Sequence, residues 1–142
     1  MNYFRIFGYV LVASVFFSLS NIVLAYGPQY RVGSGPIGVA FDNTTNSIWV
    51  TNNGSGTVSK VNVNTGTKVD YSVGLNPHGI AFDNITNSVW VTNFSSNTIS
   101  KINIYTGERN DYGIGDGPRG VAFDTITNSV WVANFNANTV SK

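Results

Sequence analysis

The sequence predicts an all-β fold assembled from repeated units. A window of 25 residues occurs three times without insertion or deletion, at 36–60, 77–101 and 118–142, so equivalent positions lie 41 residues apart. Of these 25 positions, 14 carry the same residue in all three copies. Within each copy the local signals are those of strands and turns, with no helical i, i+3, i+4 spacing. A period near 40 with four strands per unit is typical of a β-propeller, in which each unit forms one blade.

The first unit illustrates the four strands expected in each blade. Short β-prone segments at 39–42 and 47–52 are joined by a polar turn, and a Gly-rich turn leads to a third strand at 57–63. Gly66 closes a tight hairpin turn in the position that needs a positive φ, and 67–73 forms the fourth strand. We therefore expect each unit to be a four-stranded antiparallel meander.

Several recurring residues have structural roles in this arrangement. Asp42 is suited to accept hydrogen bonds from turn amides two residues further on, and Asn46 tolerates a left-handed backbone. Phe41, Trp49 and Val50 recur at fixed spacing and are expected to fill the space between adjacent sheets, because one blade cannot bury both of its faces alone. We expect the Trp residues to be buried core rather than a sugar-stacking surface.

The first 25 residues differ in kind from the rest. Arg5 precedes an apolar run from 6 to 19, and Val23-x-Ala25 places small residues where signal peptidase cuts. The run is short for a membrane span of about 20 residues. We expect residues 1–25 to be a signal peptide cleaved after Ala25, which predicts a secreted or periplasmic protein with no membrane span after cleavage. The alternative is an uncleaved N-terminal anchor.

The remaining residues, 26–142, are expected to be a partial propeller. Residues 26–34 align at the 41-residue offset with later fourth strands, which predicts a lone outer strand. Residues 35–75 and 76–116 are two blades, and 117–142 is an incomplete third blade. Because propellers close with about four to eight blades, we expect an incomplete arc of about three blades. It is either part of a longer propeller or one half of a head-to-tail self-association of two copies.

Composition excludes several classes of function. After removal of residues 1–25, seven Lys and Arg residues balance seven Asp and Glu residues, and no basic cluster is present for binding nucleic acid. The sequence contains no Cys, which removes thiolate catalysis, Cys-ligated zinc and disulfides. No cofactor and no metal site are predicted.

The string from Trp90 to Ile102, Trp-Val-Thr-Asn-Phe-x-x-Asn-Thr-Ile-Ser-Lys-Ile, resembles the Tyr-Val-Thr-Asn (YVTN) family of β-propeller repeats. The resemblance covers 26–142 and implies the fold and a secreted bacterial or archaeal origin. The Pro-x-Gly-Ile-Ala opening of the repeat, with Trp in the second strand, is also similar to NHL-type propellers and to virginiamycin B lyase.

The similarity to the lyase implies a specific chemistry. In that enzyme the second strand typically ends Trp-Phe-Thr-Glu, and Glu and His residues on one face hold magnesium. The corresponding positions here are Asn52, Asn93 and Asn134. An amide in place of a carboxylate supplies neither the charge partner of the metal nor a proton acceptor, which argues against lyase chemistry on these blades.

Candidate binding residues are the positions at which the repeats differ. The Pro-x-Gly slot holds Ile37, His78 and Arg119, and the loops between the second and third strands also vary. His78 is the single histidine and the one candidate acid–base residue, with a solvated loop histidine as the alternative. Arg119 is suited to hold a carboxylate or phosphate, with an ordinary surface arginine as the alternative. The predicted ligand-binding residues are His78, Arg119, Asn52, Asn93 and Asn134.

Three functions remain open from the sequence. The first is a binding module in which Asn, Ser and loop aromatic residues present a polar face to a small ligand or a protein. The second is a propeller enzyme of the lyase or lactonase type, with His78 as acid–base residue and metal ligands on blades outside this sequence. The third is a structural repeat protein of the cell envelope.

Overall fold

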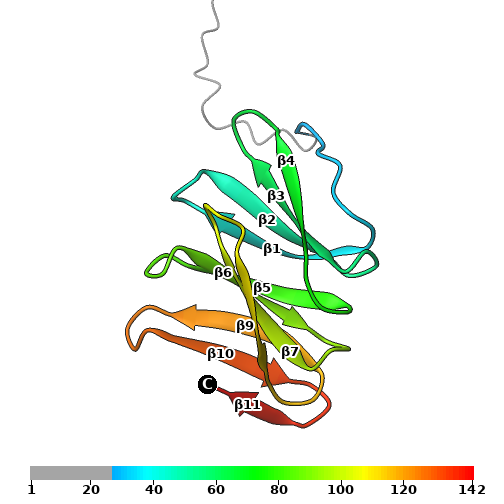
Figure 1. Cartoon of the computed structure of the whole chain (residues 1–142), viewed down its shortest axis with the longest axis vertical. Helices are drawn as coiled ribbons and strands as arrows, with labels where there is room; N and C mark the ends of the chain where they lie inside the picture. Colours follow the sequence, from blue (N-terminus) through cyan, green and yellow to red (C-terminus); the bar gives the residue numbers. More distant parts are fainter. Residues whose placement is uncertain (1–26) are drawn as a thin grey trace, which may run out of the picture.

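The computed structural model describes residues 27–142, which form eleven β-strands and no helix. Hydrogen bonding groups the strands into three antiparallel sheets, which lie one below another in Figure 1. The first sheet contains β1 (Pro36–Asp42), β2 (Ser47–Asn52), β3 (Thr57–Asn62) and β4 (Lys68–Ser72). The second contains β5 (Pro77–Asp83), β6 (Ser88–Asn93), β7 (Thr98–Asn103) and β8 (Arg109–Gly113). The third contains β9 (Pro118–Asp124), β10 (Ser129–Asn134) and β11 (Thr139–Ser141). The predicted all-β fold of antiparallel blades is confirmed.

The turn between the first two strands of each sheet is held by an aspartate, as the sequence predicts. Asp42 accepts hydrogen bonds from the backbone N–H groups of Thr44 (2.9 Å) and Thr45 (3.0 Å), from the Thr45 hydroxyl and from the indole of Trp49 (3.3 Å). Asn46 adopts a left-handed backbone with φ 50°. Burial alone would raise the pKa of Asp42, but these hydrogen bonds lower it below the ordinary value.

A buried apolar cluster lies between the first and second sheets. Trp49 has no exposed surface, and its ring stacks on Tyr71 with centroids 5.3 Å apart. Ile80 and Phe82 of β5 pack against the same cluster from the second sheet. The other buried members are Val58, Val89, Val91, Ile102 and Ile104. Burial between adjacent sheets is therefore confirmed for Trp49.

The outermost faces of the stack are less covered. Trp131 is 40% exposed and Phe41 is 52% exposed, whereas Phe82, the equivalent of Phe41 in the second unit, packs into the core. Within residues 27–142 no further sheet covers the Phe41 face of the first sheet or the Trp131 face of the third. The prediction that every Trp is buried is therefore wrong for Trp131, because burial of a Trp at this position depends on a neighbouring sheet that covers it.

A threonine hydroxyl links each sheet to the next. Thr51 Oγ1 accepts a hydrogen bond from the Gly38 N–H (2.7 Å) and donates to the His78 carbonyl of the following sheet (2.8 Å). Thr92 Oγ1 accepts from the Gly79 N–H (2.8 Å) and donates to the Arg119 carbonyl (2.7 Å). These hydroxyls fix the backbone of the slot residues, so the sheet stacking also positions the variable side chains.

The segment that precedes β1 forms no strand in its described part, residues 27–34, where a lone outer strand is expected. Within residues 27–142 no third strand of a preceding blade lies beside it for pairing. The segment nevertheless follows the course of later units. The Asn53 N–H donates to the Gly35 carbonyl (2.8 Å), as the Phe94 N–H does to the Asn76 carbonyl (3.0 Å).

The leader expected at 1–25 and its cleavage after Ala25 lie outside the described residues. In residues 27–142 the structure contains no helix of the length and apolarity that a membrane crossing requires.

Candidate functional site

The variable slot residues lie in β-bulges at the start of the first strand of each sheet. Pairing of β5 with β6 is regular from Ile80 onward but shifts between Pro77 and Ile80, and His78 falls within this irregular stretch. The same shift surrounds Ile37 in β1 and Arg119 in β9. A bulge turns side chains out of the ordinary alternation of a strand. We call the three slot residues, together with the loops 53–56, 94–97 and 135–138, the loop face.

Contacts between loops and neighbouring units hold the loop face together. Asn53 Nδ2 donates to the Pro77 carbonyl (3.3 Å), which ties the first loop to the slot of the second sheet. Arg119 makes the corresponding connection between the second and third sheets. Its Cζ atom lies 3.8 Å from the ring centroid of Phe135 and 4.9 Å from that of Phe94. The structure therefore brings a cation and two aromatic rings together on one face.

Arg119 has no anionic partner in the described chain. No carboxylate of residues 27–142 lies within ion-pair distance of its guanidinium, and none of its N–H groups donates to an acceptor in that range. Its Nε atom is buried without a hydrogen-bond partner. Stacking on Phe94 and Phe135 thus orients a partly exposed guanidinium whose hydrogen-bonding capacity is unused within the described protein.

His78 is half-buried on the same face. Burial lowers the pKa of its imidazole below the ordinary value, and the positive charge of Arg119 lowers it further. The imidazole is therefore mainly neutral at pH 7, so that one ring nitrogen can donate a hydrogen bond and the other can accept one. The structure places the two predicted residues His78 and Arg119 in one electrostatic environment.

The asparagines at the ends of the second strands do not belong to this surface. Asn52 and Asn93 have no exposed area, and Asn134 is 1% exposed. Asn52 Nδ2 donates to the hydroxyls of Thr57 (3.1 Å) and Ser59 (2.9 Å) in the adjacent strand. Asn93 and Asn134 make the same pair of contacts in their own sheets.

This burial argues against the ligand-binding role of Asn52, Asn93 and Asn134, which stays a prediction. The side chains point into the blade and join the second strand to the third, so a ligand on the surface does not reach them. In every unit the third strand begins with Thr and has Ser two residues later. This recurrence was the sequence signal for the structural role of the asparagines.

The loop aromatic residues are evident from the sequence, but their contact with the slot residue is not. Phe94 and Phe135 follow the second strand directly in the second and third units, while Asn53 takes that place in the first. The cation and the aromatic rings are separated by 25 and 16 residues, so only the stacking of sheets brings them together. Within residues 27–142 no group of three or more His, Asp or Glu side chains is placed to hold a metal ion.

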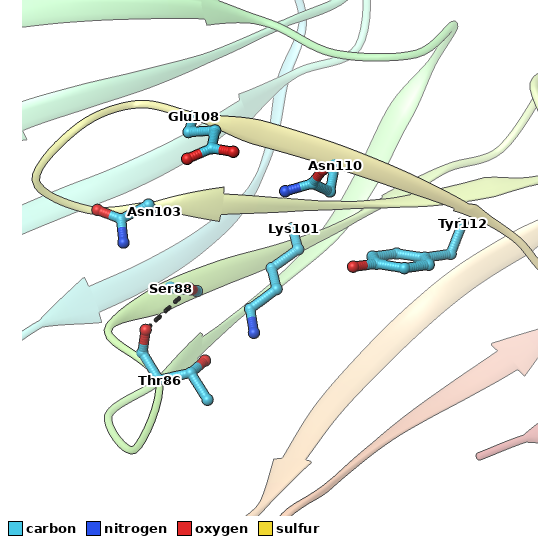
Figure 2. A pocket seen from close by; sticks show the side chains of 7 residues that line it. All are labelled: Thr86, Ser88, Lys101, Asn103, Glu108, Asn110 and Tyr112. Carbon is cyan, nitrogen blue, oxygen red and sulfur yellow. Dashed lines mark hydrogen bonds between the residues drawn. The ribbon is translucent and has the colours of Figure 1, made fainter.

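Figure 2 shows a second candidate, a polar pocket of about 220 Å³ beside β7 and β8. Its lining includes Lys101, whose Nζ lies 5.1 Å from the ring centroid of Trp90. Lys60 occupies the equivalent position in the first sheet, where it stacks on Trp49 and donates to the Ile104 carbonyl (2.7 Å) of the next sheet. The remaining lining residues are Thr86, Ser88, Asn103, Glu108, Asn110 and Tyr112.

This pocket is a weaker candidate than the loop face. Its lysine is repeated in every unit, and at Lys60 the same side chain serves the packing of one sheet on the next. Its residues Glu108 and Asn110 do differ from Thr67 and Val69 of the first unit. On the loop face, however, the differing residues include Arg119, a cation without a hydrogen-bond acceptor within residues 27–142. Specificity is expected where the repeats vary, since the invariant positions build the blades.

Comparison with known proteins establishes the fold. No family model matches the sequence, and no curated protein matches it. Hydrazine synthase of Kuenenia stuttgartiensis is similar over 84% of this chain and 38% of its own, with a TM-score of 0.67 and 15% identity. An inactive variant of virginiamycin B lyase from Staphylococcus aureus with quinupristin is similar over 75% and 37%, with a TM-score of 0.67 and 20% identity.

The nidogen/laminin complex contains a third similar chain, matched over 71% of this chain and 40% of its own, with a TM-score of 0.62 and 19% identity. This chain thus spans about two fifths of the length of the solved structures it matches. Likeness at these identities extends to the fold alone. The blade-like sheets and these neighbours together identify a β-propeller-like fold.

Proposed function

We propose that this chain is a module of a secreted or periplasmic β-propeller, built from repeats of the Tyr-Val-Thr-Asn type, that binds a small polar ligand or a protein on its loop face. The observation that carries the proposal is the contact of Arg119 with Phe94 and Phe135 on a face where the units differ. Invariant Asp, Trp and Asn positions hold the turns and sheets, whereas Arg119, His78, Phe94 and Phe135 are slot and loop residues of one face.

The chemistry of the loop face supports binding. It combines an oriented guanidinium, a neutral imidazole and exposed aromatic surface, with Phe135 57% exposed. Arg and aromatic residues are enriched where proteins bind partners and ligands. Propeller neighbours that contact a protein or a small molecule, as in the nidogen/laminin complex and the lyase with quinupristin, make such a role consistent with the fold.

The second candidate is an enzyme of the lyase or lactonase type. Structural likeness to virginiamycin B lyase and the position of His78 on the loop face favour it. On this alternative the metal ligands belong to blades outside this sequence, because the equivalent second-strand ends here are buried asparagines. Stabilisation by magnesium alone of a propeller that includes those blades would favour this enzyme over the binding module.

Thermal denaturation of the full chain with a panel of amino acids, sugars, nucleotides and carboxylic acids tests the proposal. A compound that binds the native state raises the midpoint. We expect the rise to shrink in Phe135→Asn, which copies Asn53 of the first unit, and to persist in Asn110→Ala on the pocket of Figure 2. Loss in Asn110→Ala with retention in Phe135→Asn, or no response to any compound, would contradict the proposal.

A further inference from the structure

We propose that the Arg119 guanidinium binds an oxyanion group, such as a carboxylate, phosphate or sulfate, of the ligand that the loop face accepts. The inference rests on the proposed function and adds the chemical class of the ligand. It is drawn from the charge, the stacking and the unused hydrogen bonds of one side chain.

The described part of the chain leaves the positive charge of Arg119 without an ion-pair partner. The ion pairs of residues 27–142 join Lys68 to Asp70 and Arg109 to Asp111, both on outer strands. Asp116, the carboxylate nearest to Arg119 in sequence, is exposed and accepts a hydrogen bond from Asn136 Nδ2 (3.4 Å). A partly buried guanidinium without an acceptor is costly, and a bound anion would supply both the charge and the acceptors.

The Arg119 guanidinium is also oriented before any ligand binds. Ring contacts at 3.8 Å to Phe135 and 4.9 Å to Phe94 restrict the side chain, and stacking leaves the N–H groups at the edge of the planar group. That edge matches the two oxygens of a carboxylate or phosphate in a bidentate arrangement. Because the rotamers are restricted before binding, less conformational entropy is lost when the anion binds.

The repeats differ in the charge of the slot residue. The same slot holds Ile37 in the first unit, where the adjacent loop begins with Asn53 instead of Phe. The fold thus accepts an apolar residue in the slot, and the blade does not require a cation there. Phe94 and Phe135 accompany the units with polar slot residues, which ties the aromatic loop positions to the chemistry of the slot.

The experiment is a titration of the full chain with sodium phosphate, sodium sulfate and sodium benzoate at constant ionic strength, followed by thermal denaturation and calorimetry. The three anions distinguish a phosphate, a sulfate and a carboxylate as the preferred group. We expect at least one of them to bind, and we expect Arg119→Ile to weaken it by about tenfold or more, since hydrogen bonds to charged groups contribute strongly. Arg119→Lys, which keeps the charge without the fork, should weaken it less.

Arg109→Ile is the matched control, because it removes an arginine that pairs with Asp111 on an outer strand and should leave anion binding unchanged. Equal binding by the parent and Arg119→Ile would overturn the inference. If an uncharged compound binds the loop face and no anion does, the oxyanion site is wrong while the proposed function stands. If no compound of either set binds, both are wrong.

Discussion

Replacing Thr92 by Val removes one hydroxyl and keeps the shape of the side chain. Thr92 has no exposed surface, and its Oγ1 accepts from the Gly79 N–H (2.8 Å) and donates to the Arg119 carbonyl (2.7 Å). The variant leaves both backbone groups without this partner at the junction of two sheets. Each buried group left unpaired costs about 1–3 kcal/mol, so we expect a loss of about 2–4 kcal/mol in the free energy of unfolding.

Urea denaturation of the full chain, followed by tryptophan fluorescence, measures this loss. The matched control is Ala133→Thr, which adds the hydroxyl at the equivalent position of the third sheet. Ala133 is exposed, and within the described residues no sheet follows it, so we expect a change within about 0.5 kcal/mol. A loss below about 0.5 kcal/mol for Thr92→Val would show that the hydroxyl does not link the sheets.

Three further predictions follow from individual contacts. Gly79→Ala should destabilise the chain by about 1–3 kcal/mol in urea denaturation, because a Cβ there meets the Arg119 carbonyl oxygen. Gly120→Ala should be nearly neutral, since the nearest neighbour of a Cβ at that position is 3.7 Å away, and equal effects of the two substitutions would contradict this packing. For Asp83, burial raises the pKa, but hydrogen bonds from Thr86 and the Trp90 indole lower it overall. The ionised Asp83 therefore stabilises the folded chain above the unfolded pKa of about 3.9, and this stabilisation is lost as pH falls through the lowered folded pKa. Asp83→Asn should therefore flatten the dependence of stability on pH in that acidic range, and an unchanged slope would count against it. NMR titration of His78 should give a pKa below about 6.5 that rises in Arg119→Ile, and an unaltered pKa in that variant would exclude the influence of Arg119.

Much of the fold was predictable because the same pattern of strands and turns occurs three times in the sequence. The second strand was placed at 47–52, and the structure has β2 at Ser47–Asn52. The turn roles of Asp42 and Gly66 were also predictable. Few residue types accept hydrogen bonds from turn amides as Asp does, and few adopt a positive φ such as the 70° of Gly66. Local hydrogen bonding determines these features, so local sequence is sufficient.

Features that depend on neighbouring sheets were harder to predict. Trp131 is the equivalent of Trp49, and Phe41, on the opposite face of its sheet, is the equivalent of Phe82. The exposure of Trp131 and Phe41 follows from the absence of a covering sheet in the described residues rather than from their own sequence. Residues 27–34 carry the pattern of an outer strand but have no strand beside them in the described structure. Periodicity identifies a face but not what covers it.

The candidate site was predictable in part for the same reason. His78 and Arg119 were identified because the slot varies among units. Asn52 was singled out because a strand-end amide was compared with a catalytic carboxylate, and the structure shows its amide donating to the Ser59 hydroxyl in the next strand. The contact of Arg119 with Phe94 joins two sheets and has no local sequence signature.

The most direct test of the loop face as the binding surface is an NMR titration of the nitrogen-15-labelled full chain with the anion that binds best. We expect the backbone and side-chain shifts to change most at His78, Phe94, Arg119 and Phe135, which the structure brings together. Changes that gather instead around Lys101 in the pocket of Figure 2 would contradict the assignment of the binding surface to the loop face.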